Sequence, residues 1–165
     1  MPKLATKAAN NVFYKARIEA AKWNSSLKSR EDTAEETGID RTRLAYIELN
    51  TINPHPEEVL ILSEAYNAPE LCNHFCSRMC PLGMKTVNSV ESAELEKTVL
   101  QLLSIFQTLP DIKTELINIA ADGVIDTDER PMMEEIVKKL DNAADKIKAL
   151  KIYFQKYIGK SNRTK

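Results

Sequence analysis

The stretch that decides the fold of the N-terminal part reads Ser29-Arg-Glu-Asp-Thr-Ala-Glu-Glu-Thr-Gly38-Ile-Asp-Arg-Thr-Arg-Leu-Ala-Tyr-Ile-Glu48-Leu-Asn-Thr-Ile-Asn53-Pro54. Ser29 can cap the exposed backbone N–H groups at the start of a helix, and the acidic residues after it suit the helix dipole. Gly38 tolerates the left-handed conformation that ends a helix, and Asp40 can cap the next helix. The stretch therefore predicts two short helices joined by a turn at Gly38.

Two helices joined in this way are typical of a helix-turn-helix. Leu44 and Ile47 lie at helical spacing in the second helix and are expected to face a core. The periodicity of apolar residues predicts further helices over about residues 11–24, with Trp23 on the apolar face, and over 57–66. Asn53-Pro54-His55-Pro56 is a turn between helices.

This stretch resembles the phage-repressor/Cro-like (XRE) family. The family pattern has Ser-Gln-Glu-x-Leu-Ala-x-x-x-Gly-Val-Ser, then a recognition helix ending in Ile-Glu, then Asn-Pro, and residues 29–54 match it without gaps. The resemblance extends over roughly residues 10–70. The sequence departs from the family pattern at Thr33 and Thr37, where the family prefers leucine, and at Asn50, where glycine is common.

The resemblance implies binding to double-stranded DNA, with the second helix of the pair in the major groove. The residues that would then reach base edges are Arg41, Thr42, Arg43 and Tyr46. Arg30 takes the place of a family glutamine that contacts a phosphate, and weaker phosphate-contact candidates are Arg17, Asn50 and Thr51. Glu48 tends to be structural in this family, so we do not expect it to contact DNA.

Composition limits the function classes. The chain has 165 residues and a formal net charge of -1, so nucleic-acid binding would have to come from a local surface. The longest apolar run, near residues 98–110, is too short and polar to span a bilayer, and the N-terminus lacks the apolar region of a secretory signal. We therefore expect a cytoplasmic protein without a membrane partner. No phosphate-binding loop or nucleophile elbow is present, so we do not expect an enzyme.

Three cysteines follow the region that resembles the XRE family. Cys72, Cys76 and Cys80 are four residues apart, with His74 between the first two. On a helix they would share one face and pack beside Leu71, Phe75 and Met79, as small apolar residues. In a loop, the same cysteines and His74 could hold zinc, or the cysteines could hold an iron–sulfur cluster. A thiol switch is the third alternative.

The C-terminal part predicts a helical bundle. A heptad-like seam, which Pro110 is expected to end, contains Leu95, Val99, Leu102, Phe106 and Leu109. A short helix over 112–120 and a turn over 122–129 should follow. One long helix to about Ile158 carries an apolar stripe of Met133, Val137, Leu140, Ala144, Ile147, Leu150 and Phe154. A bundle this small commonly gains buried area by pairing with a second copy.

The fold expected is all-α, with an N-terminal five-helix repressor-like helix-turn-helix domain and a C-terminal bundle with one long helix. We expect a DNA-binding domain over residues 8–70, a cysteine-containing connector over 71–89, a dimerisation or sensing module over 90–158 and a disordered tail over 159–165. The function expected is a sequence-specific transcriptional regulator that acts as a homodimer on an operator. Two alternatives remain open: a protein-interaction module such as an antitoxin or adaptor, and a regulator that senses metal or redox state through its cysteines.

Overall fold

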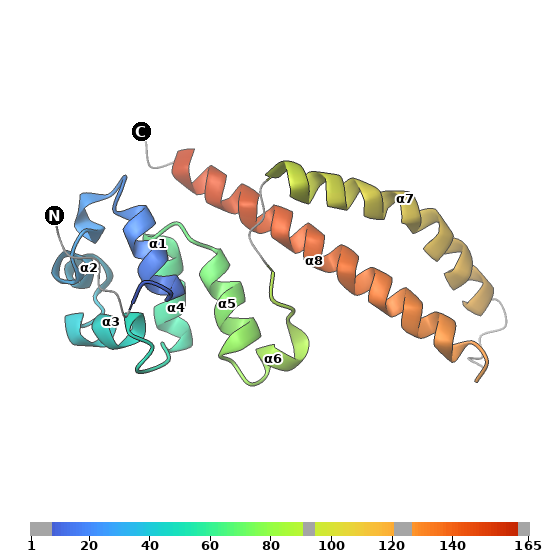
Figure 1. The fold of residues 1–165 in the computed structure, drawn as a ribbon, viewed down its shortest axis with the longest axis horizontal. Helices are drawn as coiled ribbons and strands as arrows, with labels where there is room; N and C mark the ends of the chain where they lie inside the picture. Colours follow the sequence, from blue (N-terminus) through green and yellow to red (C-terminus); the bar gives the residue numbers. More distant parts are fainter. Residues whose placement is uncertain (1–7, 91–94, 121–126, 162–165) are drawn as a thin grey trace. The chain divides into compact units, whose positions relative to one another are not determined.

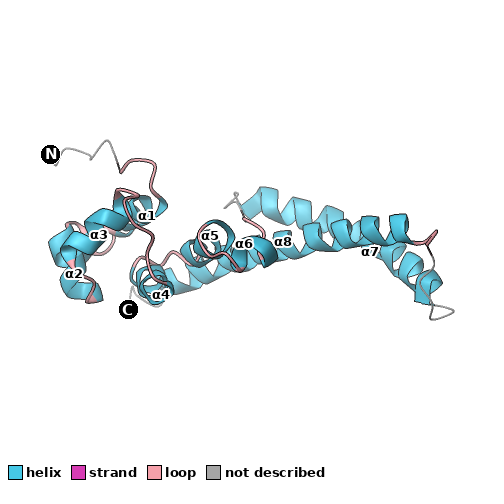
Figure 2. Ribbon diagram, turned by 90° about the horizontal axis from the view of Figure 1, so that it is seen from below, coloured by secondary structure: helices cyan, strands magenta, loops and turns pink. Residues whose placement is uncertain are grey.

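The computed structural model describes residues 8–90, 95–120 and 127–161. Over these residues the chain is built from helices joined by loops and contains no strand (Figure 2), which confirms the all-α fold predicted from the sequence. The chain divides into two compact units. Unit 1 comprises Met1–Ser89 and Gln155–Lys165, and unit 2 comprises Val90–Phe154. None of the helices in the described ranges has the length and apolar character needed to cross a bilayer.

Unit 1 is a cluster of short helices around one core. In the order of Figure 1 they are α1 (Val12–Ala20), a 3₁₀ helix η1 (Ser25–Leu27), α2 (Arg30–Thr37), α3 (Arg41–Glu48), α4 (Pro56–Ala65), α5 (Glu70–Arg78) and α6 (Gly83–Thr86). The largest fully buried apolar side chains of this core are Phe13, Leu27, Leu44, Ile47, Val59, Leu62 and Leu71. Every helix from α1 to α5 contributes to it or packs against it, so the core fixes α3 from several sides.

The first helix is shorter than the sequence predicts. α1 ends at Ala20, and Trp23, expected on its apolar face, is 39% exposed. Asn24 explains the early end, because its side chain accepts a hydrogen bond from the backbone N–H of Ser26 at 3.0 Å and begins η1. Asparagine favours such local bonds over a continuing helix.

Residues 71–89, expected as a connector, contain α5 and α6. Leu71 lies in the same core as α3, with Phe75 and Met79 packed against it. Their positions are those expected if the cysteine-containing segment is helical. α5 therefore extends the helical cluster past residue 70.

Unit 2 contains α7 (Leu95–Ala120) and most of α8 (Arg130–Ser161). The sequence predicts that Pro110 ends a helix, but Pro110 lies inside α7. Proline removes one backbone hydrogen bond and bends a helix without always ending it, and α7 is curved in Figure 1. α8 continues through residues 159–161, which were expected in the tail. Residues 162–165, and most of the predicted turn over 122–129, lie outside the described residues.

The apolar seams predicted for α7 and α8 are only partly buried. Among the residues of unit 2 that the structure describes, the buried apolar ones are Leu102, Ile105, Ile112, Ile119, Ile136 and Ala143. Most of the predicted stripe of α8 is instead exposed, including Val137, Leu140, Ile147 and Phe154. Periodicity identifies an amphipathic helix, but it does not say which part of a wide apolar face the neighbouring helix covers.

Candidate nucleic-acid interface

The turn between α2 and α3 is fixed by the residues that the sequence singles out. The Oγ of Ser29 accepts a hydrogen bond from the Asp32 N–H at 3.1 Å at the start of α2. Gly38 has a left-handed φ of 69° and ends α2. Asp40 Oδ1 then accepts from the N–H groups of Thr42 and Arg43, at 2.8 and 3.0 Å, and starts α3. These local interactions set the direction in which α3 leaves the turn.

The inner face of α3 is anchored in the core. Leu44 and Ile47 are each 1% exposed. Thr33, at a position where the family prefers leucine, is fully buried, and its hydroxyl donates to the carbonyl of Ser29 at 2.7 Å. Thr37 donates in the same way to Thr33. The two threonines fill these positions without leaving an unsatisfied hydroxyl, which explains the departure from the family pattern.

The outer face of α3 presents three side chains to solvent. Arg41 and Thr42 are exposed in the first turn, and Tyr46 follows one turn later with 46% of its surface exposed. Arg41 forms an ion pair with Glu31 of α2 in which both side chains are more than half exposed. Such a pair contributes little and is easily replaced by a stronger partner. The three predicted base-contact residues therefore lie together and are accessible.

Arg43, the fourth predicted base-contact residue, forms an ion pair with a residue of the same domain. Its guanidinium forms a two-point ion pair with Glu58 of α4, and one of these hydrogen bonds, from Nη2 to Oε2, is 2.8 Å. Glu58 also accepts a hydrogen bond from the backbone N–H of His55 at 2.6 Å. One carboxylate thus caps α4 and ties it to α3. Sequence reasoning missed Glu58 because its partner is fifteen positions away in the chain.

Arg30 and Arg17 meet at Glu48. Arg30 Nε donates to Glu48 Oε2 at 2.7 Å, and its side chain remains 26% exposed. The side chain of Arg17 is 4% exposed and pairs with both oxygens of the same carboxylate. The weaker prediction that Arg17 contacts a phosphate is therefore wrong, because its charge is used inside the domain. The structural role predicted for Glu48 agrees with its burial.

Asn50 lies just after α3 in a left-handed conformation, with a φ of 57°. The side-chain amide of Asn11 donates to Asn50 Oδ1 at 2.7 Å and to the carbonyl of Ile47 at 2.8 Å. Asn50 itself is exposed beside the end of α3, although its Oδ1 is bonded to Asn11. Asn11 is buried and fixes this end of the helix, a role that no local motif indicated.

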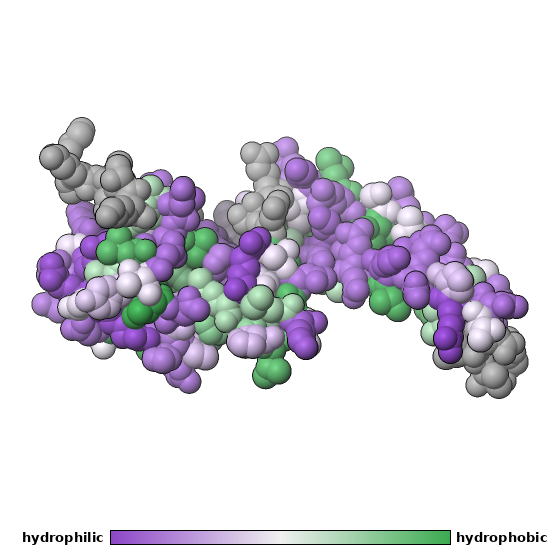
Figure 3. All heavy atoms as spheres, turned by 60° about the horizontal axis from the view of Figure 1, so that its bottom comes forward, coloured by the Kyte–Doolittle hydropathy of each residue, from purple (hydrophilic) through white to green (hydrophobic). Residues whose placement is uncertain are grey.

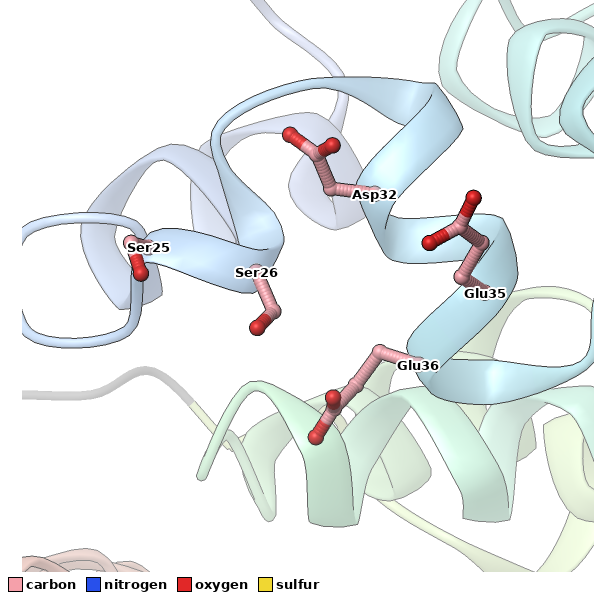
Figure 4. A pocket seen from close by; sticks show the side chains of 5 residues that line it. All are labelled: Ser25, Ser26, Asp32, Glu35 and Glu36. Carbon is pink, nitrogen blue, oxygen red and sulfur yellow. The ribbon is translucent and has the colours of Figure 1, made fainter.

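A hollow of about 390 Å³ lies between η1 and α2. Figure 4 shows Asp32, Glu35 and Glu36 of α2 around it, with Ser25 and Ser26 on the other side. Three carboxylates repel a phosphate backbone. This side of the domain is therefore unsuited to nucleic acid, in contrast to the exposed face of α3.

The cysteines lie on or next to α5. Cys72, Cys76 and Cys80 are half-buried and none forms a disulfide. Cys72 donates to the hydroxyl of Ser63 at 3.4 Å, and His74 meets the edge of Phe13 with ring centroids 6.5 Å apart. Burial, and then the charge of Arg78, lower the pKa of His74. Within the described residues no three His, Cys, Asp or Glu side chains are grouped to hold a metal ion.

Comparison with known proteins identifies the N-terminal region. Residues 25–70 match a protein-family model described as helix-turn-helix. This region is an XRE-type helix-turn-helix, as the resemblance predicted. The match supports a DNA-binding regulator of the XRE type, a class of regulators and not of enzymes. No curated protein and no solved structure matches the chain.

Proposed function

We propose that this chain is a sequence-specific transcriptional regulator that binds an operator as a homodimer. The observation that carries the proposal is the division of α3 into two faces. Leu44, Ile47 and Glu48 anchor one face, while Arg41, Thr42 and Tyr46 project from the other. A helix fixed in this way can enter the major groove as a rigid unit, which is what base reading requires.

Each exposed residue of α3 has a defined chemical role in this proposal. Arg41 donates two hydrogen bonds to the O6 and N7 atoms of a guanine, giving up its weak pair with Glu31. Thr42 contacts a neighbouring base edge, and the ring of Tyr46 packs against a thymine methyl group. Arg30 and Asn50, at the two ends of the helix pair, contact backbone phosphates.

Arg43 has a positioning role. Its pair with Glu58 joins α3 to α4, so Arg43 reads a base only where DNA displaces Glu58. We assign DNA reading to the N-terminal helices and dimer formation to the module over residues 90–158. A two-fold symmetric dimer then presents two copies of α3 to an inverted repeat.

The test is selection from a random double-stranded DNA library by the reduced full-length chain, at a low and a high salt concentration. Enrichment of an inverted repeat supports the proposal and yields the operator. Retention of DNA without enrichment, weakening steeply with salt, would mean that only the phosphate backbone is bound. A chain that retains no DNA at either salt concentration would overturn the proposal in favour of a protein-interaction module.

A further inference from the structure

The two helices of unit 2 leave one broad apolar face uncovered. α7 and α8 run antiparallel and meet along Ile112, Ile119 and Ile136, with Lys139 Nζ 3.5 Å from Glu115 Oε1. Outside this seam, large apolar side chains about half exposed are Leu103, Phe106, Ile117, Val137, Ile147 and Phe154. Apolar side chains that reach the surface are visible as green spheres in Figure 3.

Many of the exposed apolar residues of the two helices lie on the same side of the pair. On each helix several of them follow a buried residue by one position, as Phe106 follows Ile105 and Val137 follows Ile136, and the others continue the same stripes at helical spacing. One position turns a helix by about 100°. Because the two helices face each other and run in opposite directions, the same turn carries both stripes to one side. We name this surface, made by Leu103, Phe106, Ile117, Val137, Leu140, Ala144, Ile147 and Phe154, the open face.

We propose that the open face binds the open face of a second copy of this chain, with the two α8 helices antiparallel. Its stripe on α8 follows the alternating four- and three-residue spacing of helix–helix packing, and small Ala144 lies at its centre. In antiparallel packing Ala144 meets Ile147 of the partner subunit, and Val137 meets Phe154 of the partner subunit. The result is a four-helix bundle built from two identical hairpins.

Charge along the edge of the stripe favours a second copy in this orientation. Asp141 and Lys148 are one heptad apart on the outer edge of α8. In the antiparallel arrangement Asp141 lies opposite Lys148 of the partner subunit, and the two-fold axis repeats the pair. A parallel arrangement would instead place Asp141 opposite Asp141 of the partner subunit. The edge is therefore self-complementary, as a two-fold symmetric interface requires.

The open face is large enough for a specific dimer. From Val137 to Phe154 the stripe is about 27 Å long at 1.5 Å per residue, and two helices side by side are about 20 Å wide. The face therefore covers about 540 Å² on each copy, or about 1,100 Å² in total, which exceeds the roughly 1,000 Å² that a biological interface is expected to bury. The inference deepens the proposed function and rests on it for the use of the dimer at two half-sites, but the pairing itself is measured without DNA.

The experiment compares the full chain with Ile147→Glu and Leu60→Glu by analytical ultracentrifugation. Ile147 lies on the open face, whereas Leu60, on α4 of unit 1, is similarly exposed at 57% and serves as the matched control. We expect the unchanged chain and Leu60→Glu to be dimers. Ile147→Glu should raise the dimer Kd at least tenfold, because a carboxylate would be buried without a partner. Circular dichroism confirms that the helix content is retained.

Charge reversal tests the orientation independently of folding. Asp141→Lys and Lys148→Asp should each raise the dimer Kd several-fold, because each places like charges opposite each other twice. The double variant should return the Kd to within about twofold of the unchanged chain, because the pairs are restored in reverse. A double variant no tighter than the single variants would overturn the antiparallel arrangement.

The proposal as a whole is overturned if the full chain is monomeric at tens of micromolar concentration, or if Ile147→Glu dimerises as well as Leu60→Glu. Binding to a single half-site separates this failure from failure of the proposed function. Monomeric Ile147→Glu should keep the half-site affinity of the unchanged chain and lose the additional affinity for an inverted repeat. A dimer that binds no DNA would leave the open face supported and overturn only the DNA-binding proposal.

Discussion

Arg17 and Glu48 form a two-point ion pair inside the N-terminal domain, with Nε–Oε1 and Nη2–Oε2 distances of 2.5 and 3.1 Å. Their side chains are 4% and 2% exposed. Arg17 Nη1 also donates to the carbonyls of Leu27 and Lys28, so the pair joins α1, α3 and the end of η1. Burial acts to lower the pKa of Arg17, but the hydrogen bond and charge of Glu48 outweigh it and raise that pKa. The guanidinium therefore stays charged, and its contacts hold α3 in place.

Replacing Glu48 should destabilise the domain strongly. Glu48→Gln leaves the buried guanidinium of Arg17 without a counter-charge, which costs about 3–5 kcal/mol of the free energy of unfolding. Urea unfolding followed by the fluorescence of Trp23, the single tryptophan, measures this change. Glu36→Gln, at an exposed position of α2, is the control and should cost less than about 0.5 kcal/mol. Equal stability of the two variants would show that the pair does not support the fold.

The pair of Glu58 with Arg43 should give the domain a pH dependence. Burial acts to raise the pKa of Glu58, but hydrogen bonds from Arg43 and from the His55 backbone outweigh it and hold the pKa below its ordinary value of 4.5. A carboxyl with a lowered folded-state pKa stabilises the fold above its unfolded pKa. This contribution, about 1.5–3 kcal/mol for a hydrogen bond to a charged group, should be lost as the pH falls from 4.5 through the folded-state pKa.

Glu58→Gln checks this assignment. Unfolding free energies measured from about pH 7 down to about pH 3 should fall less steeply in the variant, because one group that binds protons on unfolding is gone. Glu57→Gln, at the neighbouring exposed position, should leave the slope unchanged. A Glu57 variant that flattens the curve as much as the Glu58 variant would contradict the role of the Arg43 pair.

Local chemistry explains which parts of this fold and site the sequence could predict. The capping and turn roles can be predicted from the sequence because these residues act within three or four positions of their own: Ser29, Gly38 and Asp40. The roles of Arg17 and Arg43 depend on carboxylates 31 and 15 positions away. A basic residue predicted near DNA can be an internal ion-pair partner, and only the packing of α1, α3 and α4 distinguishes the two.

The C-terminal helices show the same limit for apolar residues. The spacing of Val137, Leu140 and Ile147 identifies an apolar stripe on α8. The buried residues of α8 are instead Ile136 and Ala143, which lie on the adjacent stripe. A single helix sequence contains no information on which neighbour covers each part of a wide apolar face. Pro110 is a related case, because its effect on α7 depends on whether the surrounding contacts tolerate a bend.

Two glycines should respond differently to alanine. A Cβ at Gly83 would overlap the backbone carbonyl of Cys76, so Gly83→Ala forces α6 away from α5 and should cost about 1–3 kcal/mol. A Cβ at Gly38 meets open space, so Gly38→Ala carries only the left-handed backbone strain of about 1 kcal/mol. The same urea unfolding measures both. A Gly83 variant as stable as the unchanged chain would show that α5 and α6 do not approach closely.

Arg41 should contribute to sequence recognition more than to general DNA affinity. Arg41→Ala should weaken binding to the selected operator by about 1–3 kcal/mol and binding to random DNA by much less, because a bidentate contact to guanine is lost. Fluorescence anisotropy with both DNAs, at one salt concentration, gives the two differences. An equal loss on both would make Arg41 a phosphate contact.

Glu31→Gln tests the same residue from its partner's side. In the proposed binding mode Arg41 leaves the carboxylate of Glu31 to reach DNA. Removal of that carboxylate should therefore strengthen operator binding by up to about 1 kcal/mol, the value of an exposed ion pair. Glu35→Gln removes a charge from the same helix but from the acidic hollow, where no arginine of α3 is held. If both substitutions strengthen operator binding equally, the gain comes from the change in net charge. A gain confined to Glu31→Gln would show that the Arg41–Glu31 ion pair opposes DNA binding, because Arg41 must leave it.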